Sequence, residues 1–178
     1  MPFVLNGDPL AFGQDVEIDG FAYSYETLTI MSAGDREALG VTWVEPEPVV
    51  PTAEDICRQI DAWRDARING GFSYMGHTFQ SRATDRENIA ALGADAADAI
   101  RDGAAAGDYL WHPDFPTGFG FITEANITVP MDAFQTKGLR SRGLAFKASQ
   151  TFHARDLKDA VLAAEVPSSV DWQTGWPE

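Results

Sequence analysis

The first 44 residues alternate short apolar runs with turn signals, a pattern that predicts a small β module. The predicted strands cover residues 3–5, 16–18, 21–23 and 41–44. Asp19-Gly20, between the second and third runs, is a strong hairpin signal. Ser32 predicts the N-cap of one helical turn that ends at Gly40. A module of this size is marginally stable alone, so we expect it to need a neighbour or a partner.

Helical periodicity begins farther along the chain. Thr52 is a predicted N-cap, and the acids that follow it suit the positive end of a helix dipole. Ile56, Ile60 and Trp63 recur at i, i+4 and i+7, which predicts one apolar stripe. This helix should end just before a β-hairpin at residues 72–79, where apolar residues alternate with small polar ones.

A second helix is predicted from Thr84 to about residue 102, because Thr84 and Glu87 have the spacing of a capping box. Beyond a loop of small residues, the chain becomes rich in aromatic residues. Residues 109–113 and 118–123 predict strand-like segments around a turn, and residues 126–129 fit either a short strand or an approach turn.

A long final helix is predicted from about Pro130 to about Glu165, since no proline interrupts this stretch. Pro130 suits the first helical position. The helix would be roughly 50 Å long and is expected to pack along another helix, in its own chain or in a second copy. Gly138 and Gly143 each weaken it by about 1 kcal/mol relative to alanine, which predicts a break in its first half.

The order of these elements predicts an α+β protein in four parts. Between the two structured regions, the sequence Glu-Pro-Glu-Pro-Val-Val-Pro favours an extended, solvated linker. The predicted parts are a small β module at 1–44, the linker at 45–51, an α+β domain at 52–166 and a tryptophan-containing tail at 167–178.

The chain is strongly acidic, with a formal net charge of −14, and the charge is uneven. Residues 1–51 alone carry a net charge of −8, and Arg36 is their only base. This balance disfavours nucleic acid and anionic membrane surfaces as partners and favours proteins with basic patches. No apolar run reaches the length that spans a bilayer, so we expect no membrane insertion.

The residue types that carry catalysis or bind metals are few and scattered. His77, His112 and His153 have no second histidine or cysteine at a ligand spacing. Cys57 is the single cysteine and lies in a helical pattern, which favours a buried structural position. Gly118-Phe119-Gly120 lacks the surroundings of a phosphate-binding loop. We therefore predict a protein that is not an enzyme, with no catalytic, metal-binding or cofactor-binding residues.

Aromatic side chains in the second half of the chain have two interpretations. They could line a groove for a sugar or peptide, or they could form a core between the hairpin and the helices, which we favour. The two tail tryptophans would be docking residues if they were exposed. The candidate interface residues are Tyr109, Trp111, Phe119, Phe121, Phe146, Trp172 and Trp176.

Three stretches carry a resemblance to a known family. They are residues 64–72, residues 79–89 with an Asp85-Arg86 corner, and residues 153–161. In these stretches the chain resembles an uncharacterised domain of tailed-bacteriophage and prophage proteins, which are described as tail-fibre and tail-fibre-assembly proteins. The resemblance extends over about residues 53–165 and more loosely over 1–50.

The resemblance implies a non-enzymatic structural protein of the tail or tail fibre that docks and oligomerises. The alternative is a tail-fibre assembly chaperone, and a glycan-cleaving tail enzyme is a third possibility. The implied partners are other tail or fibre proteins and further copies of the chain. The implied location is the virion tail, or the host cytoplasm during assembly. The family brings no catalytic or cofactor residues with it.

Overall fold

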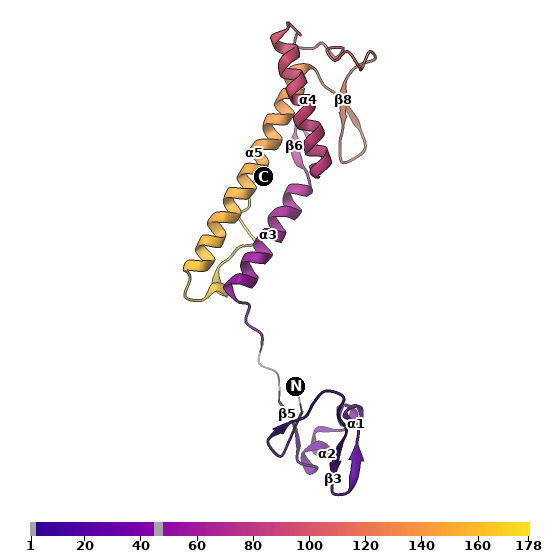
Figure 1. The fold of residues 1–178 in the computed structure, drawn as a ribbon, viewed down its shortest axis with the longest axis vertical. Helices are drawn as coiled ribbons and strands as arrows, with labels where there is room; N and C mark the ends of the chain where they lie inside the picture. The colour runs from indigo at the N-terminus through magenta and orange to yellow at the C-terminus, as the bar shows by residue number, and fades with distance from the viewer. Residues whose placement is uncertain (1–2, 45–47) are drawn as a thin grey trace. The chain divides into compact units, whose positions relative to one another are not determined.

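The computed structural model describes residues 3–44 and 48–178. The chain divides into two compact units, Met1–Val50 and Pro51–Glu178 (Figure 1). Both combine helices with small sheets, which confirms the predicted α+β class. Part of the predicted linker, residues 45–47, lies outside the described residues, and residues 48–52 contain neither helix nor strand.

The front unit, residues 3–44, contains two small antiparallel sheets around one apolar core. Its strands are β1 (Phe3–Leu5), β2 (Asp8–Pro9), β3 (Val16–Ile18), β4 (Phe21–Tyr23) and β5 (Val41–Trp43). One sheet has the order β2-β1-β5, and the other is the β3-β4 hairpin. Asp19 and Gly20 both have positive φ in that hairpin, as its two-residue turn requires. The buried core residues are Phe3, Leu10, Val16, Tyr25, Leu28 and Val41.

Two short helices complete the front unit. Helix α2 (Ala33–Ala38) begins as predicted, because the Ser32 hydroxyl accepts a hydrogen bond from the backbone N–H of Asp35 at 3.2 Å. Helix α1 (Tyr25–Ile30) was not predicted. Its β-branched residues favour strands, and the signal for the helix is the Ser24 cap that precedes it.

The helical domain, residues 51–178, is built along one long helix. Its helices are α3 (Ala53–Asn69), α4 (Ala83–Arg101) and α5 (Ala133–Ala163), with a 3-10 turn, η1 (Pro167–Ser169). Its hairpins are β6 (Phe72–Tyr74) with β7 (His77–Phe79), and β8 (Gly120–Ile122) with β9 (Thr128–Pro130). Helix α4 packs beside the first half of α5, and α3 packs beside the second half (Figure 1).

This arrangement produces two apolar cores along α5. The first lies between α4, α5 and the two hairpins, and its buried residues are Phe72, Phe79, Ile89, Phe119, Val129, Met131, Leu139 and Phe146. The second lies between α3, α5 and the C-terminal segment, and its buried residues are Ile56, Ile60, Ala154, Val161 and Trp176. Trp63, predicted on the same stripe as Ile56 and Ile60, is 41% exposed at the edge of this core.

Several predicted boundaries were wrong for local reasons. Helix α4 begins at Ala83, because the Asp85 carboxylate accepts a hydrogen bond from the backbone N–H of Arg82 at 3.0 Å. The predicted capping pair of Thr84 and Glu87 is therefore inside the helix. Residues 109–113 form turns instead of a strand.

The start of α5 also differs from the prediction. Pro130 is the last residue of β9 and does not open the helix. Asp132 is the N-cap of α5, and its carboxylate accepts a hydrogen bond from the backbone N–H of Gln135 at 2.8 Å. A carboxylate at the N-cap satisfies a helix N–H that has no partner within the helix.

Helix α5 is continuous over 31 residues, so the predicted break at Gly138 and Gly143 does not occur. Both glycines lie where the β6-β7 hairpin meets the helix. A methyl group on Gly138 would overlap the Tyr74 hydroxyl, and one on Gly143 would lie 3.0 Å from the Phe72 ring. The glycines thus permit close packing of the hairpin. Burial there raises the pKa of Tyr74, and the negative charge of Asp132 adds to the shift.

Candidate interaction surfaces

The aromatic residues between α4 and β8 surround Phe119, which is buried. The ring centroids of Trp111 and Phe121 lie 5.0 and 5.2 Å from that of Phe119, in edge-on geometry. The Trp111 indole N–H donates to the backbone carbonyl of Met131 at 3.0 Å. Trp111 and Phe121 are half-buried, and Tyr109 is 41% exposed. Most of these predicted interface residues therefore contribute to the domain's own core.

Phe146 and the tail tryptophans also pack inside the helical domain. The Phe146 ring stacks on Phe72, with centroids 6.2 Å apart. Trp176 is buried, its ring lies 4.9 Å from that of His153, and its indole N–H donates to the carbonyl of Trp172 at 2.8 Å. Trp172 is half-buried. Of the seven candidate residues, Tyr109 is thus the most exposed.

A polar clamp around the buried Gln150 holds the C-terminal segment on α3 and α5. The Gln150 side-chain amide donates to the backbone carbonyl of Pro177 at 2.7 Å, and Arg67 donates to the same carbonyl at 2.8 Å. Arg67 also donates to the Gln150 side-chain carbonyl at 2.9 Å. The predicted tail at 167–178 is therefore fixed to the helical domain. No sequence signal revealed this clamp, because its members are 27 to 110 residues apart.

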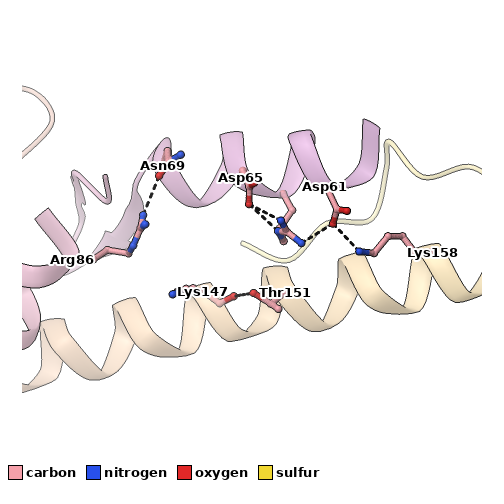
Figure 2. A network of polar contacts seen from close by, with 8 residues as sticks. Asp61, Asp65, Asn69, Arg86, Lys147, Thr151 and Lys158 are labelled. Atoms are coloured by element: carbon pink, nitrogen blue, oxygen red, sulfur yellow. Dashed lines mark hydrogen bonds and ion pairs between the residues drawn. The ribbon is translucent and has the colours of Figure 1, made fainter. Parts of the chain in front are cut away.

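Charged side chains join the three long helices at the surface (Figure 2). Asp61 on α3 accepts hydrogen bonds from Lys158 on α5 at 2.7 Å and from Arg64 at 2.6 Å. At the other end of α3, Arg86 donates to the Asn69 side chain at 3.0 Å and to the backbone carbonyl of Ser81. These contacts position the helices relative to one another.

The Asp85-Arg86 corner has a structural role in this arrangement. Asp85 accepts the hydrogen bond that caps α4, and Arg86 ties the start of α4 to the end of α3 (Figure 2). Both side chains are engaged in the domain's own contacts. The Asp85-Arg86 corner is therefore explained by folding.

The front unit presents a different kind of surface. Arg36, its only base, donates from its guanidinium to the backbone carbonyls of Leu28 and Met31 at 3.0 and 2.5 Å and lies over the Phe3 ring. The one positive charge is thus directed at the unit's own backbone. The large apolar side chains that remain exposed in the described front unit are Phe12, Phe21, Ile30, Trp43 and Val44.

The histidines do not form a chemical site in the described residues. His112 is buried, accepts a hydrogen bond from the backbone N–H of Asp114 at 3.2 Å, and lies 3.8 Å from the Asp95 carboxylate. The buried Nε2 of His153 has no hydrogen-bond partner among the residues that the structure describes, and its ring packs on Trp176. No group of three or more His, Cys, Asp or Glu residues in the described ranges is placed to hold a metal ion.

No helix in the described part of the chain combines the length and the apolar character needed to cross a membrane. Cys57 is half-buried against the second core of the helical domain. An open groove between α4 and the β8-β9 hairpin is lined by apolar and uncharged residues, with Asp85 as its single acid.

Comparison with known proteins identifies the helical domain. A family model described as Domain of unknown function (DUF4376) matches residues 51–174, which is more than half of the chain. The match begins where the second compact unit begins. No curated protein and no solved structure matches the sequence.

Proposed function

We propose that this chain, which belongs to the family described as Domain of unknown function (DUF4376), is a non-enzymatic structural protein of a bacteriophage tail or tail fibre. In this proposal the front unit docks on another tail protein, and the helical domain is the body that it attaches. The proposal is carried by the division of the chain into two units with separate cores, only one of which belongs to the family. A small unit with its own core suits the role of an attachment module.

The surface of the front unit supports docking on a basic partner. Residues 1–51 carry a net charge of −8, and the internal bonds of Arg36 leave no free cation in the described front unit to neutralise it. Exposed apolar side chains lie among the acids, and Phe21 is 68% exposed. Apolar anchors supply affinity, whereas charge of one sign selects and steers a partner of the opposite sign.

The assignment to a phage tail rests on the sequence resemblance of residues 64–72, 79–89 and 153–161. These stretches form the end of α3, the passage from β7 into α4, and part of α5. The same exposed apolar residues would also suit a tail-fibre assembly chaperone that binds a folding fibre transiently.

Mass spectrometry of purified phage particles tests the proposal. We expect the chain in the particles and expect Phe21→Glu to lower its incorporation by about thirtyfold, the effect of losing roughly 2 kcal/mol at an interface anchor. Ile122→Glu is the matched control, because Ile122 is similarly exposed on a two-stranded hairpin of the other unit. Both variants are first checked for folding by circular dichroism.

Each outcome has a distinct meaning. Particles that lack the chain, together with a fibre that folds only when the chain is co-expressed, would favour the chaperone. Particles that lack the chain and assemble normally without its gene would overturn both functions. Equal incorporation of the two glutamate variants would place the docking surface outside the front unit.

A further inference from the structure

One long face of α5 remains open to solvent in the described structure. Helices α3 and α4, strand β6 and the turn η1 all contact α5 on its other side (Figure 1). On the open face, four large apolar side chains are 46% to 66% exposed. They are Phe134, Leu144, Phe152 and Leu162.

These four residues form an interrupted apolar stripe, spaced 8 to 10 residues apart along α5. At 3.6 residues per turn, they fall on one side of the helix, away from the buried Leu139, Phe146 and Val161. Leu144 and Leu162 lie at the edges of this face, where it meets α4 and α3. Near the middle of the stripe, Ala145 and Ala148 are exposed on the same side of the helix, and the larger Lys147 lies on its flank. Small side chains at the centre of a stripe permit a second helix to approach closely.

We propose that this face, the open α5 stripe, binds the same stripe of a second copy in antiparallel orientation, with the two-fold axis at Ala148. Each residue then lies level with the residue equally distant from Ala148 on the other copy. Leu144 lies level with Phe152 of the second copy, and Phe134 lies level with Leu162 of the second copy. The stripe is therefore complementary to itself, as an isologous dimer interface requires.

Lys137 and Asp159 favour the antiparallel orientation. The same symmetry places Lys137 level with Asp159 of the second copy, so opposite charges face each other twice. A parallel pair in register would instead place lysine beside lysine and aspartate beside aspartate. Lys137 has no ion pair within the described residues, whereas Asp159 has one long contact with Arg155 at 3.9 Å.

The proposed dimer has a defined interface length and a defined placement of the two α3 helices. Residues 134–162 span about 42 Å of helix, enough for a shallow crossing of long antiparallel helices. Helix α3 starts beside the C-terminal end of α5, where Ala53 and Val161 belong to the same core. The two-fold axis therefore places the two α3 start points at opposite ends of the pair. This interface does not depend on the proposed function, since it uses only the helical domain.

Light scattering on the full-length chain tests the association. We expect twice the 19.4 kDa mass of one chain at high protein concentration, with dissociation on dilution. Ala148→Glu places two like charges against each other at the two-fold axis and should raise the dimer Kd at least about 100-fold. Ala94→Glu, at an exposed alanine of α4, is the matched control and should leave the Kd unchanged.

Crosslinking tests the orientation directly. In a Cys57→Ser background, Phe134→Cys and Leu162→Cys proteins should crosslink with a short bismaleimide when mixed, while neither should crosslink alone. Self-crosslinking of the Leu162→Cys protein would overturn the antiparallel arrangement. A parent chain that stays monomeric at its solubility limit, or a dimer that Ala148→Glu leaves intact, would overturn the proposal. Neither result would affect docking by the front unit.

Discussion

Gly138→Ala is expected to destabilise the helical domain, although alanine is the better helix former. Gly138 lies within α5, and the hairpin residue Tyr74 packs directly over it. A methyl group at this position would overlap the Tyr74 hydroxyl and force the hairpin away from the helix. The hairpin contributes Phe72 and Phe79 to the first core, so its displacement also loosens apolar packing.

The expected magnitude follows from two opposing terms. Replacing glycine by alanine within a helix contributes about 1 kcal/mol of stability. Forcing an additional methyl group into a packed contact costs about 1 to 3 kcal/mol. The net loss should be about 1 kcal/mol. In a Tyr74→Phe background, the nearest atom to the new methyl group becomes a ring carbon 3.1 Å away, so the cost should shrink. The coupling between the two substitutions should be about 1 to 2 kcal/mol.

Urea unfolding followed by circular dichroism measures these differences. All variants are compared at one protein concentration, because self-association would shift the midpoints. Ala160→Gly, at an exposed position of the same helix, calibrates the helix-propensity term and should cost up to about 1 kcal/mol. If Gly138→Ala stabilises the chain, or if Tyr74→Phe does not alter its effect, the close packing of hairpin and helix is wrong.

Three further predictions concern pH and the C-terminal clamp. Burial raises the pKa of Tyr74 above its ordinary value of 10.0. The contribution of the neutral Tyr74 side chain to stability should therefore be fully present below pH 10.0 and decline as the pH rises through the higher pKa of the folded state. Tyr74→Phe should remove this decline in unfolding curves measured at successive pH values. The hydroxyl and backbone N–H of Thr52 donate hydrogen bonds to the Asp55 carboxylate and lower its pKa below 3.8. The ionised carboxylate should therefore stabilise the fold fully above pH 3.8, and this contribution should be lost as the pH falls through the lower pKa of the folded state. Asp55→Asn should flatten the acid side of the same curves. Gln150→Ala removes an acceptor of Arg67 in a buried site and should lower the free energy of unfolding in urea by about 2 kcal/mol. It should also expose the C-terminal segment to proteolysis, and an unchanged rate of cleavage would contradict the clamp.

Local signals predicted most of the elements, because their causes lie within a few residues. Asp19-Gly20 fixes a hairpin turn through two consecutive positive φ angles, and Thr52 caps α3 through a hydrogen bond to the backbone N–H of Asp55. Both causes can be identified from single-residue chemistry. Helix α1 also has a local cap, Ser24, but it was missed because its β-branched residues favour a strand.

Long-range contacts account for the incorrect predictions about the glycines of α5 and the tail tryptophans. Gly138 and Gly143 weaken an isolated helix, but their contacts with Tyr74 and Phe72 are more than 60 residues away in the sequence. Trp176 looked like a docking residue, yet it is buried against His153 and Arg67. In each case the deciding partner belongs to another element, which no local pattern can indicate.

Helix α5 carries large apolar side chains on two sides. The buried Leu139, Phe146 and Val161 occupy one side, whereas Phe152 and Leu162 occupy the other and are each 66% exposed. A helix that is apolar on opposite sides needs cover on both, since an exposed apolar stripe weakens solubility. The helical domain covers only one side, and its packing gives no reason for large apolar residues on the other. The exposed stripe is therefore best explained by an interaction outside the folded chain, and its symmetry about Ala148 favours a second copy.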